Sequence, residues 1–234
     1  MSPQNPSWPG ATDLSKDVWV FEGQWDARPD DLSRCAERLL ACLDGMSPVD
    51  PSLAHWIHDT ERVKLDLDSL RELLERGRDE LDPTGESGST VGMGNADDLA
   101  AAALTVTCGA TASYMKNGIT LELPRPAAAP QLYADQPMVE LFRTMVSAWR
   151  PQWCRVDSWS LRDAVGTESA GVLGSWIAYL ERSLYTRVGE LPGDVRVVPV
   201  GDGDVFVLAA TPDELRLETI DAVRTAIDLP DALR

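Results

Sequence analysis

The sequence predicts an α+β fold, in which helices pack on a mainly antiparallel sheet. Residues 104–110 and 117–124 alternate apolar and polar side chains and are close enough in sequence to pair as antiparallel strands. Residues 29–46 and 135–151 instead carry apolar side chains at helical spacing. With 234 residues, 44% of them hydrophobic, the chain can bury a substantial core. Together these observations predict helices on one covered face of a sheet.

The first predicted strand covers residues 17–25. Its side chains alternate, with Trp19 and Phe21 on one side and Val18 and Val20 on the other. This alternation is typical of a strand that places one face on the core.

Two helices follow in the first third of the chain. The first is predicted over 29–46, with Asp30 as the N-cap and Gly45 at the C-terminal stop. The second is predicted over 66–77, with Gly77 at its end. The side chains expected to be buried are Leu32, Cys35, Leu39, either Cys42 or Leu43, Leu67, Leu70 and Leu74.

The middle of the chain combines two strands and a helix. Strand 117–124 starts on Asn117-Gly118, which is a turn signal. The residues expected on the covered face of the two strands are Leu104, Val106, Cys108, Ile119, Leu121 and Leu123, and those on the other face are Thr105, Thr107, Thr120 and Glu122. Helix 135–151 ends at Pro151. Its apolar stripe, expected in the core, is Met138, Phe142, Met145 and Trp149.

The last third contains four predicted strands. Residues 152–159 and 174–180 are strand candidates, and 195–210 is predicted as two strands joined by a tight Gly-Asp-Gly turn. Because the strands of 195–210 are apolar at almost every position, we expect both to be covered on both faces.

A helix is predicted near the C-terminus. Thr211 and Glu214 form a capping-box pattern, with Pro212 at the first helical position. An alternative start is Thr219. The side chains expected to be buried are Ile220, Val223 and Ile227.

The domain organisation is expected to be simple. Residues 1–15 are rich in Pro, Ser and Asn and are predicted to be a flexible leader, and residues 16–234 a single α+β domain with an Ala/Pro-rich internal loop at 124–134. The start of the chain lacks the basic and apolar regions of a signal peptide, and no apolar segment approaches the length of a membrane span. None of the four cysteines forms a C-x-x-C pair. A reduced, cytoplasmic protein is therefore expected.

The net charge limits the class of partner. Asp and Glu number 38 against 21 Lys and Arg, which gives −17 and a pI near 4.4. Such a charge repels nucleic acids and anionic membranes, and it attracts basic protein surfaces. Solubility alone is the alternative explanation, since many acidic proteins are not binding devices.

Both histidines lie in one short segment. Pro51 is predicted to open a short helix through His58, which would place His55 and His58 on one face. A catalytic zinc pair uses the spacing of H-E-x-x-H, with a glutamate between the rings, and zinc needs three or four ligands. Here Trp-Ile separates the two histidines and no third histidine exists. We therefore expect the pair to cap or pack and to hold no metal.

Other patterns for catalysis are equally weak. The segment "VGDGDV" (200–205) is followed by a strand and not by the helix that a phosphate loop needs. Only Asp202 and Asp204 are placed as calcium ligands, so a hairpin turn is expected. Ser169 and Ser175 stand beside glycines without forming G-x-S-x-G. With 38 carboxylates, pairs will occur by chance. No enzyme activity, cofactor or metal is therefore expected.

Tryptophan is unusually frequent, with eight residues against three Phe and four Tyr. Because the indole N–H needs a hydrogen-bond partner, most are expected to be half-buried between sheet and helices. Some could instead be exposed anchors at an interface.

Several segments together resemble the immunity protein 52 family of bacterial polymorphic toxin systems. They are "EGQWDARPDDLSRCAERLLACLDGM", "DPSLAHWI", "LLERGRD", "TVTCGA" with "NGITLELP", "GSWIAYL" and "VVPVGDGDVFVLA". They occur in the family's order and span the chain from about Val18. Two departures occur: "VGMGNADD" stands where the family usually has a Trp-Asn-Gly turn, which puts any role of that tryptophan in doubt here, and "GRD" replaces Gly-Arg-Asn-Arg.

The resemblance implies a non-enzymatic inhibitor of a cognate toxin. Toxins neutralised by the family are often nucleases delivered by type VI or other contact-dependent secretion systems. A nuclease cleft is basic, so an acidic inhibitor can occlude its active site or its substrate path. The acidic arc expected to contact the toxin is Asp59, Glu61, Asp66, Asp68, Glu72, Glu75, Asp79, Glu80 and Asp82.

Two alternatives stay open at this point. The first is a small cytoplasmic hydrolase-type enzyme that uses a carboxylate pair, which predicts a concave pocket with close, perturbed carboxyl groups. The second is a non-catalytic adaptor of a secretion complex, which predicts a large flat apolar patch. The sequence leaves the oligomeric state open.

Overall fold

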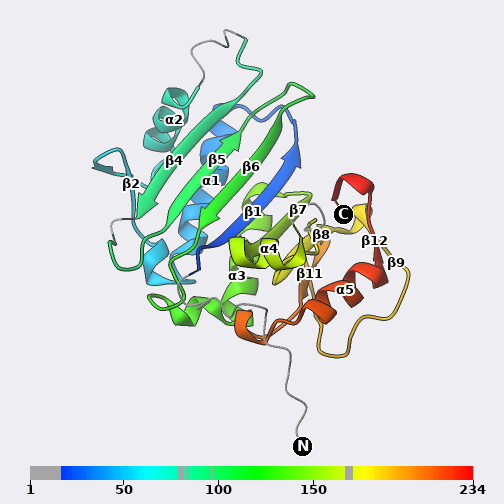
Figure 1. The fold of residues 1–234 in the computed structure, drawn as a ribbon. Coiled ribbons are helices and arrows are strands. Elements are labelled where there is room, and N and C mark those ends of the chain that lie inside the picture. Colours follow the sequence, from blue (N-terminus) through cyan, green and yellow to red (C-terminus); the bar gives the residue numbers. More distant parts are fainter. Residues whose placement is uncertain (1–16, 79–81, 83, 96, 167–170, 234) are drawn as a thin grey trace, which may run out of the picture.

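A computed structural model describes residues 17–78, 82, 84–95, 97–166 and 171–233 of the chain. Within them, helices pack against a ten-stranded sheet with the strand order β10-β11-β8-β7-β1-β6-β5-β4-β2-β3, and every neighbouring pair is antiparallel (Figure 1). The predicted α+β class is therefore confirmed. The predicted leader, 1–15, lies outside the described residues.

The bounds of the elements are as follows. The strands of the large sheet are β1 (Trp19–Asp26), β2 (Trp56–His58), β3 (Glu61–Arg62), β4 (Ser89–Asn95), β5 (Ala103–Cys108), β6 (Lys116–Glu122), β7 (Trp153–Ser158), β8 (Ile177–Glu181), β10 (Arg196–Val200) and β11 (Gly203–Val207). The α-helices are α1 (Leu32–Met46), α2 (Leu67–Arg76), α3 (Asp135–Trp149), α4 (Trp159–Val165) and α5 (Leu217–Ala226). A small second sheet pairs β9 (Thr186–Arg187) with β12 (Ile227–Asp228), and the 3-10 helices are η2 (Pro51–Leu53), η3 (Pro130–Tyr133), η5 (Arg182–Leu184), η6 (Pro212–Glu214) and η7 (Asp231–Leu233).

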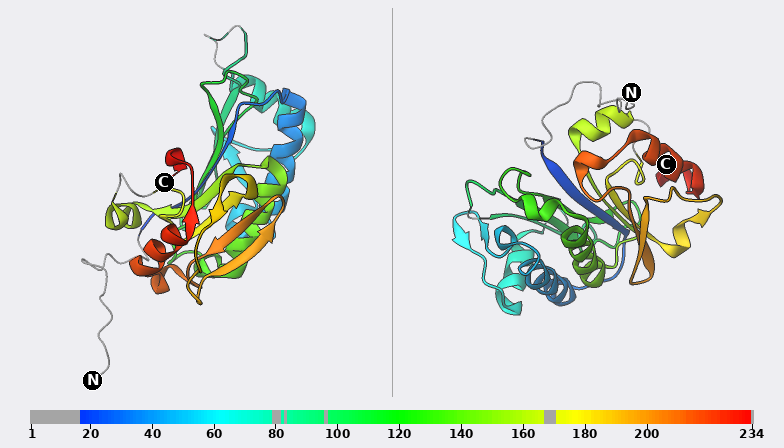
Figure 2. Two further views of the ribbon diagram at one scale, coloured as in Figure 1. Left: turned by 90° about the vertical axis from the view of Figure 1, so that its right-hand side faces the viewer. Right: turned by 90° about the horizontal axis from the view of Figure 1, so that it is seen from below.

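The layers differ between the two halves of the sheet. Helices α1, α2 and α3 lie on one face, whereas α4 and α5 lie on the other face and only beside the C-terminal strands (Figures 1 and 2). The core joins β1 to α3: the rings of Phe21 and Phe142 meet edge to face at 4.9 Å, and Trp25 stacks on Trp149 at 5.3 Å. Aromatic pairs of this kind stabilise a core beyond the area that they bury.

Strand β1 and helix α3 confirm the predicted patterns. Trp19 and Phe21 are buried while Val20 is half-buried on the opposite face. The predicted apolar stripe of α3 is also buried throughout. Both elements have one strong apolar face, so their local periodicity was a sufficient guide.

Helix α1 ends at Met46 as predicted, but its N-cap and the role of Gly45 differ from the prediction. The N-cap is Asp31 rather than Asp30, since its carboxylate accepts a hydrogen bond from the backbone N–H of Arg34 at 2.8 Å. Gly45 does not stop the helix, which continues to Met46. A Cβ at Gly45 would lie 2.7 Å from Cγ2 of Thr144 on α3. The glycine therefore permits the close approach of two helices.

The short helix predicted from Pro51 to His58 is wrong. Only η2 is helical, and Trp56 begins strand β2, which pairs with β4. Helix α2 is confirmed, but it buries Leu73 in addition to Leu70 and Leu74 and leaves Leu67 46% exposed. Leu67 is the first residue of α2, beyond the reach of the core.

The turn predicted at Asn117-Gly118 is also wrong. Both residues lie inside β6, which pairs with β5 as predicted. The Asn117 side chain is fully buried, and its amide exchanges hydrogen bonds with the backbone of Ala110 at 2.9 and 3.3 Å. The asparagine therefore closes the β5–β6 connection from within the strand.

The C-terminal hairpin is confirmed. Of its two strands, which were both predicted to be covered on both faces, only one is buried. Strands β10 and β11 join through a turn in which Gly201 has φ +55°. All of β11 is buried, whereas β10 is mostly exposed because it is an edge strand of the sheet. Thr211 makes no side-chain cap, and the helix begins only at Leu217.

Most tryptophans are more deeply buried than expected. Those exposed by 2% or less are Trp19, Trp25, Trp56, Trp149 and Trp176. In two of them the indole N–H donates to a backbone carbonyl: Trp56 to that of the nearby Leu53, and Trp176 to that of the sequence-distant Ala209. Backbone carbonyls thus allow full burial of these rings. Trp159 is the exception at 63% exposure, and Trp8 lies outside the described residues.

Candidate functional site

The β2–β3 hairpin and helix α2 enclose a groove of about 340 Å³. Asp59 lies in the turn of the hairpin, Glu61 on β3 and Glu72 on α2. All three carboxylates are exposed and line the groove. The structure therefore brings together three of the nine residues of the predicted acidic arc.

Asp66 and Asp82 have local structural roles. Asp66 is the N-cap of α2 and accepts hydrogen bonds from the N–H and hydroxyl of Ser69, which lower the pKa of its carboxyl. Asp82 accepts from the hydroxyls and backbone N–H groups of Ser87 and Thr84, which hold its pKa well below the usual range. Both carboxylates stabilise turns of their own backbone, so neither is free to contact a partner fully.

The remaining members of the arc are divided. Asp68 is exposed in the first turn of α2. Glu75 forms an ion pair with Arg78 at 3.5 Å. Asp79 and Glu80 lie outside the described residues.

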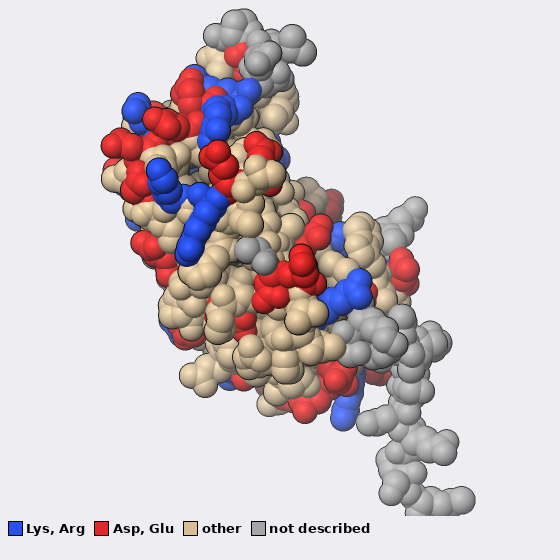
Figure 3. All heavy atoms as spheres, turned by 90° about the vertical axis from the view of Figure 1, so that its left-hand side faces the viewer, with Lys and Arg blue, Asp and Glu red and all other residues tan. Residues whose placement is uncertain are grey.

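The groove is less acidic than the sequence suggested. Its lining includes Arg62, Lys64 and Arg76 beside the carboxylates. Between Asp59 and Asp82 nine carboxylates alternate with five basic residues, so this stretch carries only four of the 17 net negative charges. The space-filling view of this side accordingly shows acidic and basic side chains intermixed (Figure 3). The surface can therefore bind a mixed-charge partner with a modest preference for a basic one.

The histidines do not share a face. His58 Nδ1 lies 2.7 Å from the carbonyl of Gly92 on β4, while His55 Nδ1 lies 2.7 Å from the guanidinium of Arg62. Each ring thus has a separate structural contact. Across the residues that the structure describes, three or more His, Cys, Asp or Glu side chains nowhere gather as a metal site would require.

A close carboxylate pair exists beneath α4. Arg155 and Arg162 bridge Glu22 of β1 to Asp157 of β7, with N–O distances of 2.8 to 3.4 Å. Asp157 is 1% exposed, and this burial raises the pKa of its carboxyl. Because two guanidinium groups neutralise the two carboxylates, the cluster joins α4 to the sheet and leaves neither carboxylate free as a nucleophile or base.

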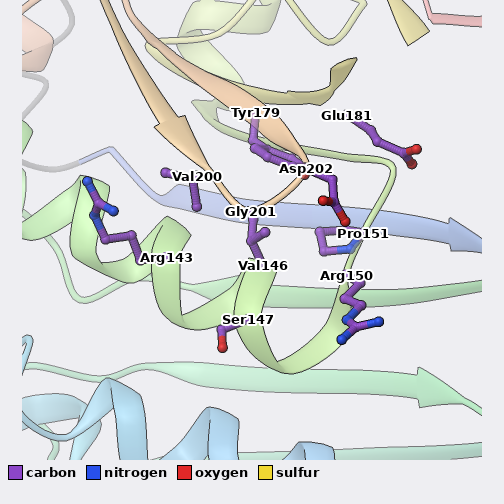
Figure 4. Close-up of a pocket in the computed structure, with 10 residues that line it drawn as sticks. All are labelled: Arg143, Val146, Ser147, Arg150, Pro151, Tyr179, Glu181, Val200, Gly201 and Asp202. Atoms are coloured by element: carbon purple, nitrogen blue, oxygen red, sulfur yellow. The ribbon is translucent and has the colours of Figure 1, made fainter. Parts of the chain in front are cut away.

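A second cavity, of about 480 Å³, lies between the end of α3 and the β10–β11 turn (Figure 4). Arg143 and Arg150 enter it from α3 and its cap, and Glu181 and Asp202 from the sheet side. Arg150 has φ 48°, which is unusual for a residue other than glycine. The two positive and two negative side chains give the cavity lining no net charge.

Of the two serines considered as nucleophiles, Ser175 has a structural contact with the backbone. Ser175 is fully buried and its hydroxyl lies 2.8 Å from the carbonyl of Val172 and 3.2 Å from that of Ile177. Its role is to hold a backbone turn. Ser169 lies outside the described residues.

Sequence reasoning missed a set of exposed apolar side chains. Leu99, Tyr114 and Trp159 are 90%, 81% and 63% exposed, the highest values among the large hydrophobic residues that the structure describes. Their exposure depends on loops and on a helix start, which periodicity does not describe. The outward-facing threonines of β5 and β6 were the available signal, because they indicated a face without apolar cover.

Comparison with known protein families finds one family whose model matches this chain. The model of the family described as Immunity protein 52 matches residues 18–234. Among solved structures, the Pseudomonas aeruginosa T6SS protein PA0821 is similar, with a TM-score of 0.52 and 13% identity over 89% of this chain and 72% of that one. At that identity the likeness shows the fold. No curated protein matches the chain. Among the described residues, no helix is both long and apolar enough to cross a membrane.

Proposed function

The chain belongs to the immunity protein 52 family, and we propose that it binds and neutralises a cognate bacterial toxin. The match to the family over nearly the whole chain is the observation that carries the proposal. The toxin is proposed to be a nuclease effector of a type VI or other contact-dependent secretion system. The likeness in fold to a protein described as a T6SS protein supports this setting.

Neutralisation is proposed to occur by binding, without turnover. The carboxylates of Glu22 and Asp157 are held by two shared arginines, and both histidines have backbone or side-chain contacts. These groups stabilise the fold. Inhibition then follows from occlusion of the toxin's active site or substrate path, and the inhibitor acts where the nucleic acid is, in the cytoplasm.

The charge supports a nuclease as the target. A nuclease cleft must be basic to hold phosphates, and a chain of charge −17 is attracted to such a cleft and accelerates the encounter. Fast association matters because few toxin molecules are enough to damage a chromosome.

The hairpin–helix surface is proposed to steer this encounter. We define it as the exposed carboxylates that are free of cap or turn roles on the hairpin and α2, namely Asp59, Glu61, Asp68 and Glu72. Their proximity to Arg62, Lys64 and Arg76 limits the preference for basic partners, so a long-range steering role fits better than tight binding.

Co-expression tests the proposal. The C-terminal toxin domain encoded in the adjacent open reading frame is expressed alone and with the full-length chain, and colony counts are measured. We expect killing by the toxin alone, full rescue by the chain, and a stable complex of the two purified proteins. Absence of both rescue and complex formation with the neighbouring toxin would contradict the proposal and favour an adaptor of a secretion complex.

A further inference from the structure

Half of the large sheet has one face without a covering helix. Strands β4, β5 and β6 have α1 and α2 behind them, whereas no described helix lies over their front face (Figures 1 and 2). On the same side of the sheet, α4 and α5 begin only beyond β1. The uncovered face therefore borders α4 on one side and the β2–β3 hairpin on the other.

The strand register shows which side chains point out of the uncovered face, and we call these side chains together the floor of the face. Three cross-strand rows point outward: Thr90, Thr107 and Gly118; Gly92, Thr105 and Thr120; and Gly94, Ala103 and Glu122. Every one of these residues is exposed or half-buried. The hydroxyls of Thr90 and Thr107 lie 2.9 Å apart and tie two strands together. The floor is thus a flat surface of small side chains.

The chemistry of the floor narrows the class of ligand. It contains no Lys or Arg, and its single ionisable residue is Glu122. Nucleic acid is disfavoured because phosphates need cations. Over the cross-strand rows of Thr and Gly a small molecule is disfavoured, because it needs a concave site that buries most of its surface. A flat face of small side chains suits a protein surface, which can approach the backbone closely.

The three most exposed large hydrophobic residues that the structure describes lie in segments that directly precede or follow β5, β6 or β7. Leu99 lies in the loop before β5 and lines a cavity of about 480 Å³ together with Ala103 and Glu122 of the floor. Tyr114 lies in the connection between β5 and β6, and Trp159 starts α4. Exposed apolar and aromatic side chains around one face are typical of an interaction site.

Trp159 is held in place by the ion cluster beneath α4. The Arg162 guanidinium lies 5.1 Å from the centroid of the indole ring. Arg162 is itself bound by Asp157 at 2.8 Å and by Glu22 at 3.4 Å, and Glu22 pairs across strands with Thr120 of the floor. A large aromatic ring with restricted motion loses little entropy on binding, which is a property of hot-spot residues.

The net charge of the chain distinguishes between two possible partners on this face, a second copy of the chain and a basic protein. A second copy would bring two chains of charge −17 together and place like-charged rims in contact. The rim near Leu99 carries Asp98 and Glu122 against a single Arg125. A basic protein surface complements this rim and is attracted by the whole chain.

On the basis of the function proposed above, we propose that the uncovered face of β4, β5 and β6, together with Leu99, Tyr114 and Trp159, is the principal docking surface for the cognate toxin. The toxin presents a basic surface that covers the threonine floor and packs on Trp159. The β2–β3 hairpin lies beside this face, and the contact of His58 with the carbonyl of Gly92 joins the two, whereas α2 lies behind the sheet. Carboxylates on the hairpin can therefore steer the same partner onto the floor.

Two variants of the full-length chain test the docking surface by titration with the purified toxin domain. Trp159→Ala removes the aromatic anchor, and Thr105→Arg places a long cation in the centre of the floor. We expect the Kd to rise at least about thirtyfold for the first and at least about tenfold for the second. The matched controls are Val188→Ala, an apolar side chain 62% exposed elsewhere, and Thr186→Arg, which adds the same charge on β9. Both controls should stay within about threefold of the unaltered chain.

The outcomes separate the two proposals. Melting temperatures close to that of the unaltered chain establish that the variants fold. If the unaltered chain binds the toxin and both variants bind within about threefold of it, the docking surface is overturned while the proposed function stands. If the unaltered chain fails to bind or rescue, the proposed function itself is lost. A dimer of the unaltered chain that Thr105→Arg dissociates would show a second copy as the occupant and would also overturn the inference.

Discussion

Asp157 is one buried residue whose ion pairs connect several elements of the fold. It lies on β7 beneath α4, is 1% exposed, and forms ion pairs with Arg162 at 2.8 Å and Arg155 at 3.2 Å. The same arginines reach Glu22 on β1. Removal of one member of such a buried cluster leaves uncompensated charge, which is more unfavourable than the loss of a surface pair.

Asp157→Ala should therefore lower the free energy of unfolding by about 3 kcal/mol. The physical reason is that Arg155 and Arg162 lose one of their two shared carboxylates in a half-buried setting. Urea denaturation followed by tryptophan fluorescence measures the change. Asp163→Ala, at an exposed position of the same helix, is the control and should change stability by less than about 0.5 kcal/mol. Equal effects of the two substitutions would show that the cluster contributes nothing special.

Gly45 shows that a glycine near the end of a helix can have either of two roles, to terminate the helix or to permit close packing. In sequence, a glycine after an apolar stripe predicts the end of a helix. In the structure it lies inside α1, where its missing side chain lets Thr144 of α3 approach. The local pattern is the same in both cases, and only the position of the second helix distinguishes them.

Single elements were predicted well where one face is strongly apolar. Helices α1, α2 and α3 and strands β1, β5, β6, β7 and β8 all lie within or close to the expected segments. The segment 51–58 failed because it is short and because Trp56 to His58 pair with β4, a partner more than 30 residues away. Tertiary pairing overrides weak local preference in such short segments.

Asp66 gives a prediction at the scale of one helix. Asp66→Ala removes the N-cap of α2 and should lower the Tm by about 3 °C, measured by circular dichroism. Because hydrogen bonds from Ser69 lower the pKa of this carboxyl, the stabilisation is present at neutral pH and is lost as the pH falls through the folded-state pKa. Asp68→Ala, two residues later, is the control and should have a smaller effect. A Tm difference that stays the same after acidification has protonated the Asp66 carboxyl would contradict the capping explanation.

At the scale of the molecule, the net charge of −17 is shared by many surfaces. The predicted acidic arc holds only a small part of it, and basic residues interrupt the arc. The charge therefore indicates the sign of the partner but not the place of contact. An uncharged face can still be the place of contact, because long-range attraction and short-range packing act at different distances.

Reversal of Glu61, Asp68 and Glu72 to Lys tests the steering role of the hairpin–helix surface. We expect the association rate constant with the toxin to fall about tenfold at low salt and to depend less on ionic strength, as measured by stopped-flow fluorescence. The control reverses Asp44, Asp213 and Glu218, exposed carboxylates on other elements, and gives the same net charge. An equal decrease in both triple variants would mean that total charge alone governs the encounter.

The sequence by itself determined the α+β class, the cores of most elements, the acidic character and, through collinear motifs, the family. These depend on periodicity, composition and order along the chain, which are local or additive properties. Only the tertiary structure decided that Asp66 and Asp82 stabilise turns, that Glu22 and Asp157 share two arginines, and that Leu99, Tyr114 and Trp159 are exposed. The reason is physical: partners and exposure are set by segments distant in sequence that meet only when the sheet forms.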